Sequence, residues 1–138
     1  MRQLENSYYE NYFLDNQFLY KSTILLVDDD PKFLSRLEEV ISLEDFNIIK
    51  ASSTEDALSK ANGRKIDLVI TEFMFKTKSS VELFSLIRKS NPVVPIIVIT
   101  GYPELISATD VRMFGGNHLL TKPLDIAKLF NILRNYCN

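Results

Sequence analysis

The chain has 138 residues, of which 46% are hydrophobic and 25% charged, so its length and composition suit one globular domain with a buried core. Its formal net charge of −2 gives no reason to expect nucleic acid as the main partner. The single cysteine, Cys137, excludes an internal disulfide and favours a reducing, cytoplasmic setting. Acidic residues interrupt the first twenty positions, which excludes a signal-peptide core, and no apolar run is long enough to span a bilayer.

Short apolar runs alternate with amphipathic stretches from about residue 23 onward, which predicts strands alternating with helices. Several of the apolar runs are continuous, as expected for strands that are buried on both faces. The predicted strands are residues 23–27, 47–51, 67–71, 96–99 and 118–121. The predicted helices begin at Pro31, at Ser53 or Thr54, near Val81, at about Pro103 and near Asp125, and the fourth runs to Phe114.

Capping residues mark several of these helix boundaries. Asp30 followed by Pro31 is a typical helix start, because aspartate accepts hydrogen bonds from the first turn and proline suits the first helical position. Asn62-Gly63 ends the second predicted helix. On the last helix, one stripe is expected to be core, and it consists of Ile126, Leu129, Phe130 and Leu133.

Repeated strand and helix units with doubly buried strands imply an open parallel sheet with helices on both faces. In such sheets ligands bind beyond the carboxyl ends of the strands. Polar residues follow or end four of the predicted strands: Asp28, Asp29, Glu72, Thr100 and Lys122. The fold is therefore expected to gather these side chains into one site.

Four stretches together resemble the receiver domains of two-component response regulators. They are residues 24–31, 67–74, 97–102 and 120–123, and the resemblance covers roughly residues 23–137. It implies a flavodoxin-like (CheY-like) α/β fold with five parallel strands in the order 2-1-3-4-5. We therefore expect a receiver-like domain at residues 23–138, preceded by an N-terminal extension at residues 1–22.

The resemblance also implies roles for the polar residues. Asp28 and Asp29 correspond to the acids that hold Mg²⁺, together with the acid at position 72 and the backbone of Met74. Thr100 and Lys122 correspond to the residues that contact a phosphoryl group on the acceptor aspartate. Hard carboxylate oxygens suit Mg²⁺, and a lysine with a hydroxyl suits phosphoryl oxygens, so the chemistry is coherent.

Several features depart from the family pattern, among them Glu72, Leu119 and the loop at residues 75–80. Glu72 replaces the acceptor aspartate, and its extra methylene moves the carboxylate by about 1.5 Å, so we expect no phosphorylation there. Glu72 is instead expected to contact Lys122 or Thr100, as a phosphoryl group would. Leu119 replaces the switch aromatic, and the loop at residues 75–80 carries two lysines that would satisfy the carboxylates without metal. The alternatives with and without Mg²⁺ therefore stay open.

We interpret the chain as an atypical, stand-alone receiver that is not an enzyme and signals through protein–protein contacts, without membrane or nucleic acid. A histidine kinase, a downstream effector or a second copy is expected to bind at about residues 103–136. One alternative is a Mg²⁺-dependent phosphorylatable switch, and a more distant one is a phosphohydrolase that uses the spacing of Asp28 and Asp30. Six aromatics also precede residue 21, as expected for a docking element or an extra packed helix: Tyr8, Tyr9, Tyr12, Phe13, Phe18 and Tyr20.

Overall fold

A five-stranded parallel sheet forms the centre of the computed structural model, which describes residues 21–137. The strand order is β2-β1-β3-β4-β5, as the resemblance implies. The strands are β1 (Thr23–Val27), β2 (Asn47–Ala51), β3 (Leu68–Thr71), β4 (Ile96–Thr100) and β5 (His118–Thr121). Each lies within one residue of its predicted bounds. The expected extension at residues 1–22 falls almost entirely outside the described residues.

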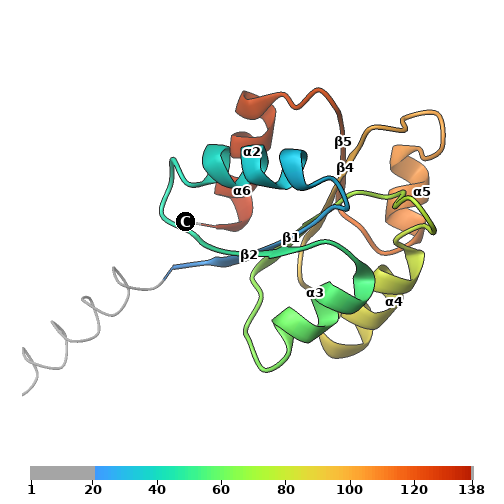
Figure 1. The fold of residues 1–138 in the computed structure, drawn as a ribbon, viewed down its shortest axis with the longest axis horizontal. Helices are drawn as coiled ribbons and strands as arrows, with labels where there is room; N and C mark the ends of the chain where they lie inside the picture. Colours follow the sequence, from blue (N-terminus) through green and yellow to red (C-terminus); the bar gives the residue numbers. More distant parts are fainter. Residues whose placement is uncertain (1–20, 138) are drawn as a thin grey trace, which may run out of the picture.

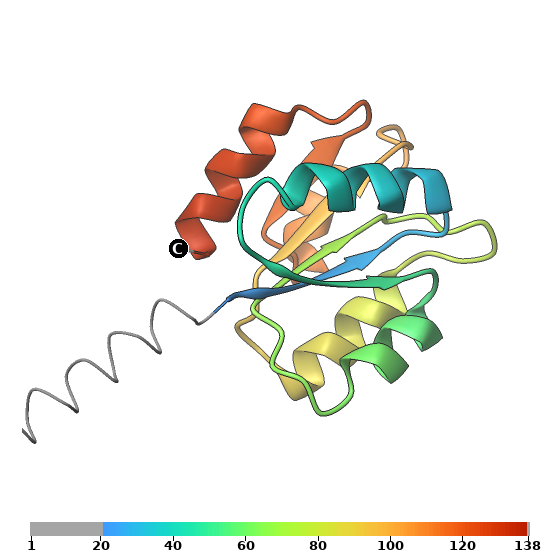
Figure 2. The same cartoon turned by 60° about the vertical axis from the view of Figure 1, so that its left-hand side comes forward.

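Helices cover both faces of this sheet (Figure 1 and Figure 2). They are α2 (Pro31–Ile41), α3 (Thr54–Ala61), α4 (Val81–Ser90), α5 (Ala108–Met113) and α6 (Ile126–Tyr136). One core lies between the sheet and α2 with α6, and the other lies between the sheet and α3, α4 and α5. The sheet therefore has no solvent-facing side, which explains its continuous apolar strands.

Alternating side chains of each central strand enter opposite cores. On β1, Leu25 and Val27 belong to the core beneath α3, α4 and α5, whereas Ile24 and Leu26 belong to the core beneath α2 and α6. All four are at most 2% exposed. This strict alternation fixes the register of the strand, because a slip of one residue would exchange the two sets.

The fourth helix is shorter than predicted. It begins at Ala108 and not at about Pro103, because Ser107 and Asp110 form a reciprocal capping box that sets its first turn. The preceding residues form a turn in which the Leu105 N–H donates to the Tyr102 carbonyl at 2.9 Å. The apolar spacing does not distinguish this turn from helix, and the cap decides the boundary.

The predicted core stripe of α6 is wrong at one position. Leu129, Phe130 and Leu133 are buried, but Ile126 is 46% exposed. Ile126 is the first residue of the helix after its cap, Asp125. Its side chain lines a surface hollow with residues of α2 and does not enter the core between the helix and the sheet.

Arg88 of α4 holds the turn that leads into β5 in place. Its guanidinium donates to the Gly115 carbonyl at 2.6 and 3.0 Å and to the Val94 carbonyl at 2.7 Å. Gly115 has a φ of +97°, which a glycine adopts without strain. This arrangement positions the strand whose end carries Lys122.

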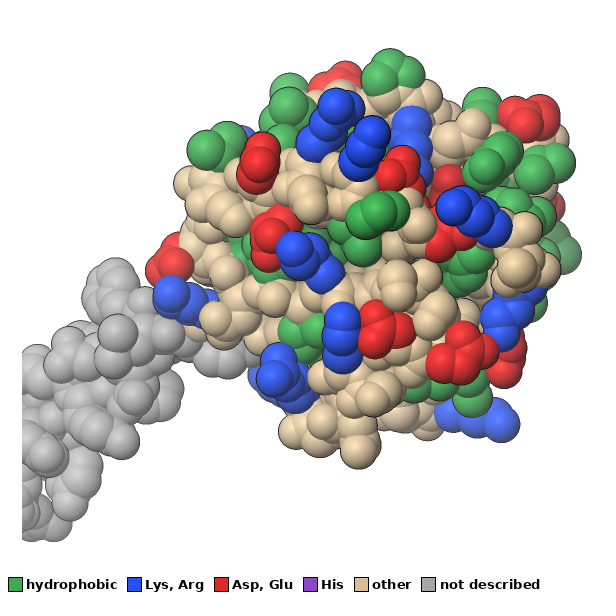
Figure 3. Space-filling model, in the orientation of Figure 1, with side chains coloured by type: hydrophobic (Ala, Val, Ile, Leu, Met, Phe, Trp, Pro, Cys, Tyr) green, Lys and Arg blue, Asp and Glu red, His purple; other side chains and the backbone are tan. Residues whose placement is uncertain are grey.

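Charged side chains of both signs are interspersed on the face shown in Figure 3. Among the described residues, no helix is long and apolar enough to cross a membrane.

Candidate functional site

The carboxyl ends of β1, β3, β4 and β5 bring the predicted polar residues to one edge of the sheet. Parallel pairing continues just past the strands, since the Glu72 N–H donates to the Val27 carbonyl at 2.9 Å. The Lys122 N–H likewise donates to the Thr100 carbonyl at 2.8 Å. A hollow of about 430 Å³ opens there, and its lining includes Asp28, Asp29, Glu72 and Lys122. The side chains expected to gather are thus adjacent.

Lys122 is the cation of this site. Its Nζ donates to Asp28 Oδ2 at 2.8 Å and lies 3.5 Å from Glu72 Oε1. The same ammonium lies 3.9 Å from the centre of the Phe33 ring, a cation–π contact from α2. Burial raises the pKa of the Asp28 carboxyl above its usual value, against the lowering effects of Lys122 and of the Asp30 N–H. The lysine therefore holds two buried carboxylates together.

Glu72 is 3% exposed, and both of its carboxylate oxygens accept hydrogen bonds. Oε2 accepts from the Phe73 N–H at 2.6 Å and, more weakly, from the Met74 N–H at 3.4 Å. Oε1 accepts from the Gly101 N–H at 3.0 Å and faces Lys122. Hydrogen bonds to the charged form make a buried carboxylate stable. Glu72 thus links its own loop to the ends of β4 and β5.

The lysines of the loop after β3 do not act as expected. Asp29 Oδ2 accepts from the backbone N–H of Lys76 at 2.6 Å, so the contribution of Lys76 comes from its backbone. Lys78 points elsewhere, with its Nζ 2.7 Å from Glu55 and 3.3 Å from Glu82. The prediction that loop ammonium groups satisfy the site carboxylates is therefore wrong. That role falls to the lysine at the end of β5.

Thr100 and Leu119, at the two switch positions, make contacts other than those that the resemblance implies. Thr100 is fully buried, and its Oγ1 accepts from the Tyr102 N–H at 3.0 Å. Within the described residues, no hydrogen bond joins Thr100 to Glu72. Leu119 is partly buried and packs against the core beneath α3, α4 and α5. Of the two alternatives expected for Glu72, a contact with Lys122 or with Thr100, the described residues form the one with Lys122.

The donor set does not fit a resident Mg²⁺ in this arrangement. Mg²⁺ requires oxygen ligands in near-octahedral geometry, and Asp28, Asp29 and Glu72 are the acids at hand. Among the described residues, however, no three acidic, histidine or cysteine side chains form a metal-sized cluster. Asp28 and Glu72 direct their oxygens at Lys122 and at backbone N–H groups. The ammonium supplies the positive charge that a cation would bring.

Asp30, which the hydrolase alternative needs as an acid/base, is engaged as a helix cap. Its carboxylate accepts from the backbone N–H groups of Lys32 at 3.0 Å and Phe33 at 3.3 Å. An N-capping role thus accounts for this residue.

Sequence reasoning missed an aromatic contact beside the site. The rings of Phe73 and Phe114 stack with centroids 6.2 Å apart, which links the residue after Glu72 to the end of α5. Nothing in the local sequence pairs these two positions. The roles of Phe33 and of the Gly101 N–H were missed for the same reason, because each depends on the meeting of distant segments.

Comparison with known families identifies the domain. A family model for the response regulator receiver domain matches residues 24–134. The chain belongs to this family. The receiver domain is 33% identical over 113 residues to the transcriptional regulatory protein GlrR of Escherichia coli (strain K12), covering 80% of this chain and 25% of GlrR. It is 32% identical over 108 residues to the heme response regulator HssR of Staphylococcus saprophyticus, covering 78% of this chain and 48% of HssR.

The chain thus spans between a quarter and a half of the length of these relatives. Solved structures show the same fold. A two-component response regulator from Clostridium difficile superimposes with a TM-score of 0.77 at 25% identity, covering 84% of this receiver domain and 95% of that chain. A CheY-like receiver domain from Methanospirillum hungatei JF-1 has a TM-score of 0.76 at 22% identity, with coverages of 84% and 93%. The domain is therefore a signalling module of the two-component type.

Proposed function

We propose that this receiver domain signals through protein–protein contacts without phosphorylation of Glu72. The observation that carries the proposal is the position of the Glu72 carboxylate, which bridges the Gly101 N–H and Lys122 at distances of 3.0 and 3.5 Å. A carboxylate that attacks phosphorus needs an accessible oxygen aligned with the donor. Here both oxygens accept hydrogen bonds in a site where only 3% of the residue is exposed. The glutamate is therefore poorly placed as a nucleophile.

The same bridge favours a fixed signalling state. The resemblance assigns to Lys122 a contact with phosphoryl oxygens, and the longer side chain of Glu72 brings a carboxylate oxygen to that lysine. The bridge also tethers the start of the loop after β4, through the Gly101 N–H. We infer that Glu72 partly imitates a phosphorylated acceptor. The domain is then held in one state and responds to what binds it.

The partner surface is proposed at about residues 103–136. Nine large hydrophobic side chains are exposed among the described residues, and five of them lie in this range: Leu105, Met113, Phe114, Ile126 and Tyr136. Exposed apolar and aromatic side chains are typical anchors of protein interfaces. A protein of the signalling pathway or a second copy would bind there. With a net charge of −2, nucleic acid and membrane surfaces are not proposed as partners.

Intact mass measurement tests the absence of phosphorylation. The full chain is incubated with Mg²⁺ and acetyl phosphate as a small phosphoryl donor, beside the variant Glu72→Asp. We expect no added phosphoryl group on the wild type and a labile added group on the variant, because aspartate restores the acceptor at its shorter reach. A phosphoryl group that forms on the wild type and is absent from Glu72→Gln would overturn the proposal and establish a phosphorylatable switch.

Nuclear magnetic resonance tests the imitation separately. Amide shifts of residues 103–136 are compared among the wild type, Glu72→Gln, and Glu72→Asp with and without acetyl phosphate. We expect the wild-type shifts to lie near those of the phosphorylated Glu72→Asp variant, since both place negative oxygens beside Lys122. If the wild type matches Glu72→Gln instead, imitation is refuted. The mass result then still decides whether Glu72 is phosphorylated.

A further inference from the structure

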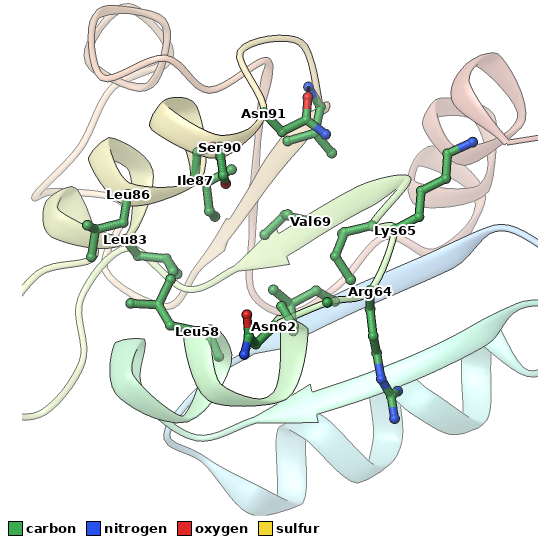
Figure 4. Close-up of a pocket in the computed structure, with 16 residues that line it drawn as sticks. Leu58, Asn62, Arg64, Lys65, Val69, Leu83, Leu86, Ile87, Ser90 and Asn91 are labelled. Atoms are coloured by element: carbon green, nitrogen blue, oxygen red, sulfur yellow. Dashed lines mark hydrogen bonds between the residues drawn. The ribbon is translucent and has the colours of Figure 1, made fainter.

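A second hollow lies away from the polar site, between α3 and α4. It has a volume of about 510 Å³ and is lined by apolar residues of both helices and of the sheet. Figure 4 shows Leu58 on α3 and Leu86 on α4, with Leu83 between them. Leu58 is 38% exposed, whereas Leu83 is fully buried at the base. We call this hollow the α3–α4 groove.

The α3–α4 groove adjoins a second hollow at the start of the described chain. Arg64 and Lys65 line both this groove and a neighbouring hollow of about 550 Å³. That neighbouring hollow is also lined by Lys21 and Thr23, the first residues of the described chain. Both hollows therefore lie at the amino edge of the sheet, opposite the edge that carries Glu72. Lys21, where the described chain begins, therefore lies at a hollow that adjoins the groove.

Residues 1–20 have the composition that such a groove requires. They contain six aromatic residues, of which Tyr12 and Phe13 are adjacent, and aromatic side chains bury large areas of apolar surface. Their three acids, against one arginine, complement the basic side chains at the rim of the groove. Twenty residues reach at most about 72 Å when extended, which is ample for a groove near the start of the described chain.

We propose that residues 1–20 bind in the α3–α4 groove of their own chain. The aromatic side chains cover Leu58 and Leu86, and the acids face Arg64 at the rim. The groove, and not the surface at residues 103–136, is thus the docking place of the aromatic extension. None of the residues that line the groove lies in the range 103–136, so the contact leaves the proposed partner surface uncovered. It therefore goes beyond the proposed function.

Hydrogen–deuterium exchange of the full chain tests this contact. The double variant Leu58→Ser/Leu86→Ser removes the apolar rim, and we expect amide exchange in residues 8–20 to become on the order of tenfold faster. Leu43→Ser is the matched control, because Leu43 is 78% exposed and does not line the groove. Exchange in residues 8–20 that is equally fast in all three proteins would overturn the proposal.

A second variant changes the aromatic extension instead of the groove and leaves the sequence of the domain intact. Tyr12→Ser/Phe13→Ser should shift the amide resonances of groove residues such as Leu58 and Leu86 and leave those of α6 unchanged. Shifts that are absent from the groove would refute the contact.

Dilution tests whether residues 1–20 bind the groove of their own chain or the groove of a second copy. Exchange protection and the mass from light scattering are followed over a hundredfold range of protein concentration. Protection that persists in a monomer supports binding within one chain. Protection that disappears on dilution together with a dimer would overturn the proposal in favour of a second copy.

Discussion

At the scale of single residues, the site is organised by one ammonium group between two buried carboxylates. Lys122 pairs with Asp28 at 2.8 Å and approaches Glu72 at 3.5 Å, while the two acids are 2% and 3% exposed. Removal of one partner of a buried ion pair costs about 3–5 kcal/mol, because the other charge stays buried. The lysine is 22% exposed, so the lower end of that range applies. The site is thus a structural feature of the domain.

Asp28 gives this site a characteristic pH dependence. Burial raises its pKa in the folded state above the ordinary value of 3.8. The stabilisation from its proton is fully present below the unfolded-state pKa and is lost as pH rises through the folded-state pKa. Lowering the pH from about 7 toward about 4 should therefore stabilise the wild type relative to Asp28→Asn, which cannot titrate. Urea unfolding followed by circular dichroism at each pH measures this difference.

Asp56 provides a control of opposite sign for that experiment. The Ser52 N–H donates to its carboxylate at 2.9 Å and lowers its pKa. Its contribution is present above 3.8 and is lost as the pH falls further, through the folded-state pKa. When the titration is continued below 3.8, the wild type should therefore lose stability relative to Asp56→Asn. Equal trends for the two variants would contradict the assignment of a raised pKa to Asp28.

At the scale of elements, two serines at helix N-termini differ in what they contribute. Ser107 begins α5 with a capping box in which its Oγ accepts from the Asp110 N–H at 3.1 Å. Ser80 precedes α4, makes no side-chain cap, and has a buried Oγ without a hydrogen-bond partner among the described residues. A buried hydroxyl without a partner costs free energy through its lost hydration. The same residue type thus stabilises one helix and not the other.

Alanine substitutions make this contrast measurable. Ser107→Ala should lower the free energy of unfolding by about 1 kcal/mol, because it removes one half of the capping box. Ser80→Ala should leave that free energy unchanged or raise it, since no hydrogen bond is lost. Denaturant unfolding of both variants gives the comparison. A loss at Ser80 that equals or exceeds the loss at Ser107 would contradict the assignment of the two caps.

At the scale of the whole molecule, two regions lie at opposite edges of the parallel sheet. The ion cluster of Lys122, Asp28 and Glu72 lies beyond the carboxyl ends of the strands, and the α3–α4 groove opens toward their amino ends. The partner surface proposed above involves α5, β5 and α6 on the flank of the sheet. The Phe73–Phe114 stack connects the ion cluster to that flank, because it joins the residue after Glu72 to the end of α5. The groove shares no lining residue with the ion cluster.

The response of the whole molecule to Mg²⁺ follows from the ion cluster. A ligand that binds only the folded state raises the unfolding temperature. Because Lys122 occupies the carboxylates, about 10 mM Mg²⁺ should leave the midpoint of the wild type unchanged at matched ionic strength. The midpoint of Lys122→Ala should rise, since the acids then lack their cation. Calorimetric scans of both proteins test this, and a clear rise for the wild type would contradict the lack of fit to Mg²⁺.

Much of the fold could be predicted because its signals are local. The doubly buried strands follow from continuous apolar runs, the predicted cap at Asp30 places the start of α2 correctly, and α6 starts next to Asp125 as expected. The resemblance supplied the strand order and the identity of the site residues. The start of α5 and the exposure of Ile126 were missed, because a capping box and an uncovered helix end outweigh apolar spacing.

The amino-acid sequence was enough to show that acids, a hydroxyl and a lysine end the strands of a parallel sheet, and that Glu72 departs from the family acceptor. How these groups pair became evident from the folded arrangement alone. Lys122 and Asp28 lie 94 positions apart, and Glu72 and Gly101 lie 29 apart. Local sequence fixes backbone conformation and side-chain chemistry. The partner of each charge depends on which strand ends become neighbours and on the angstrom-scale reach of each side chain.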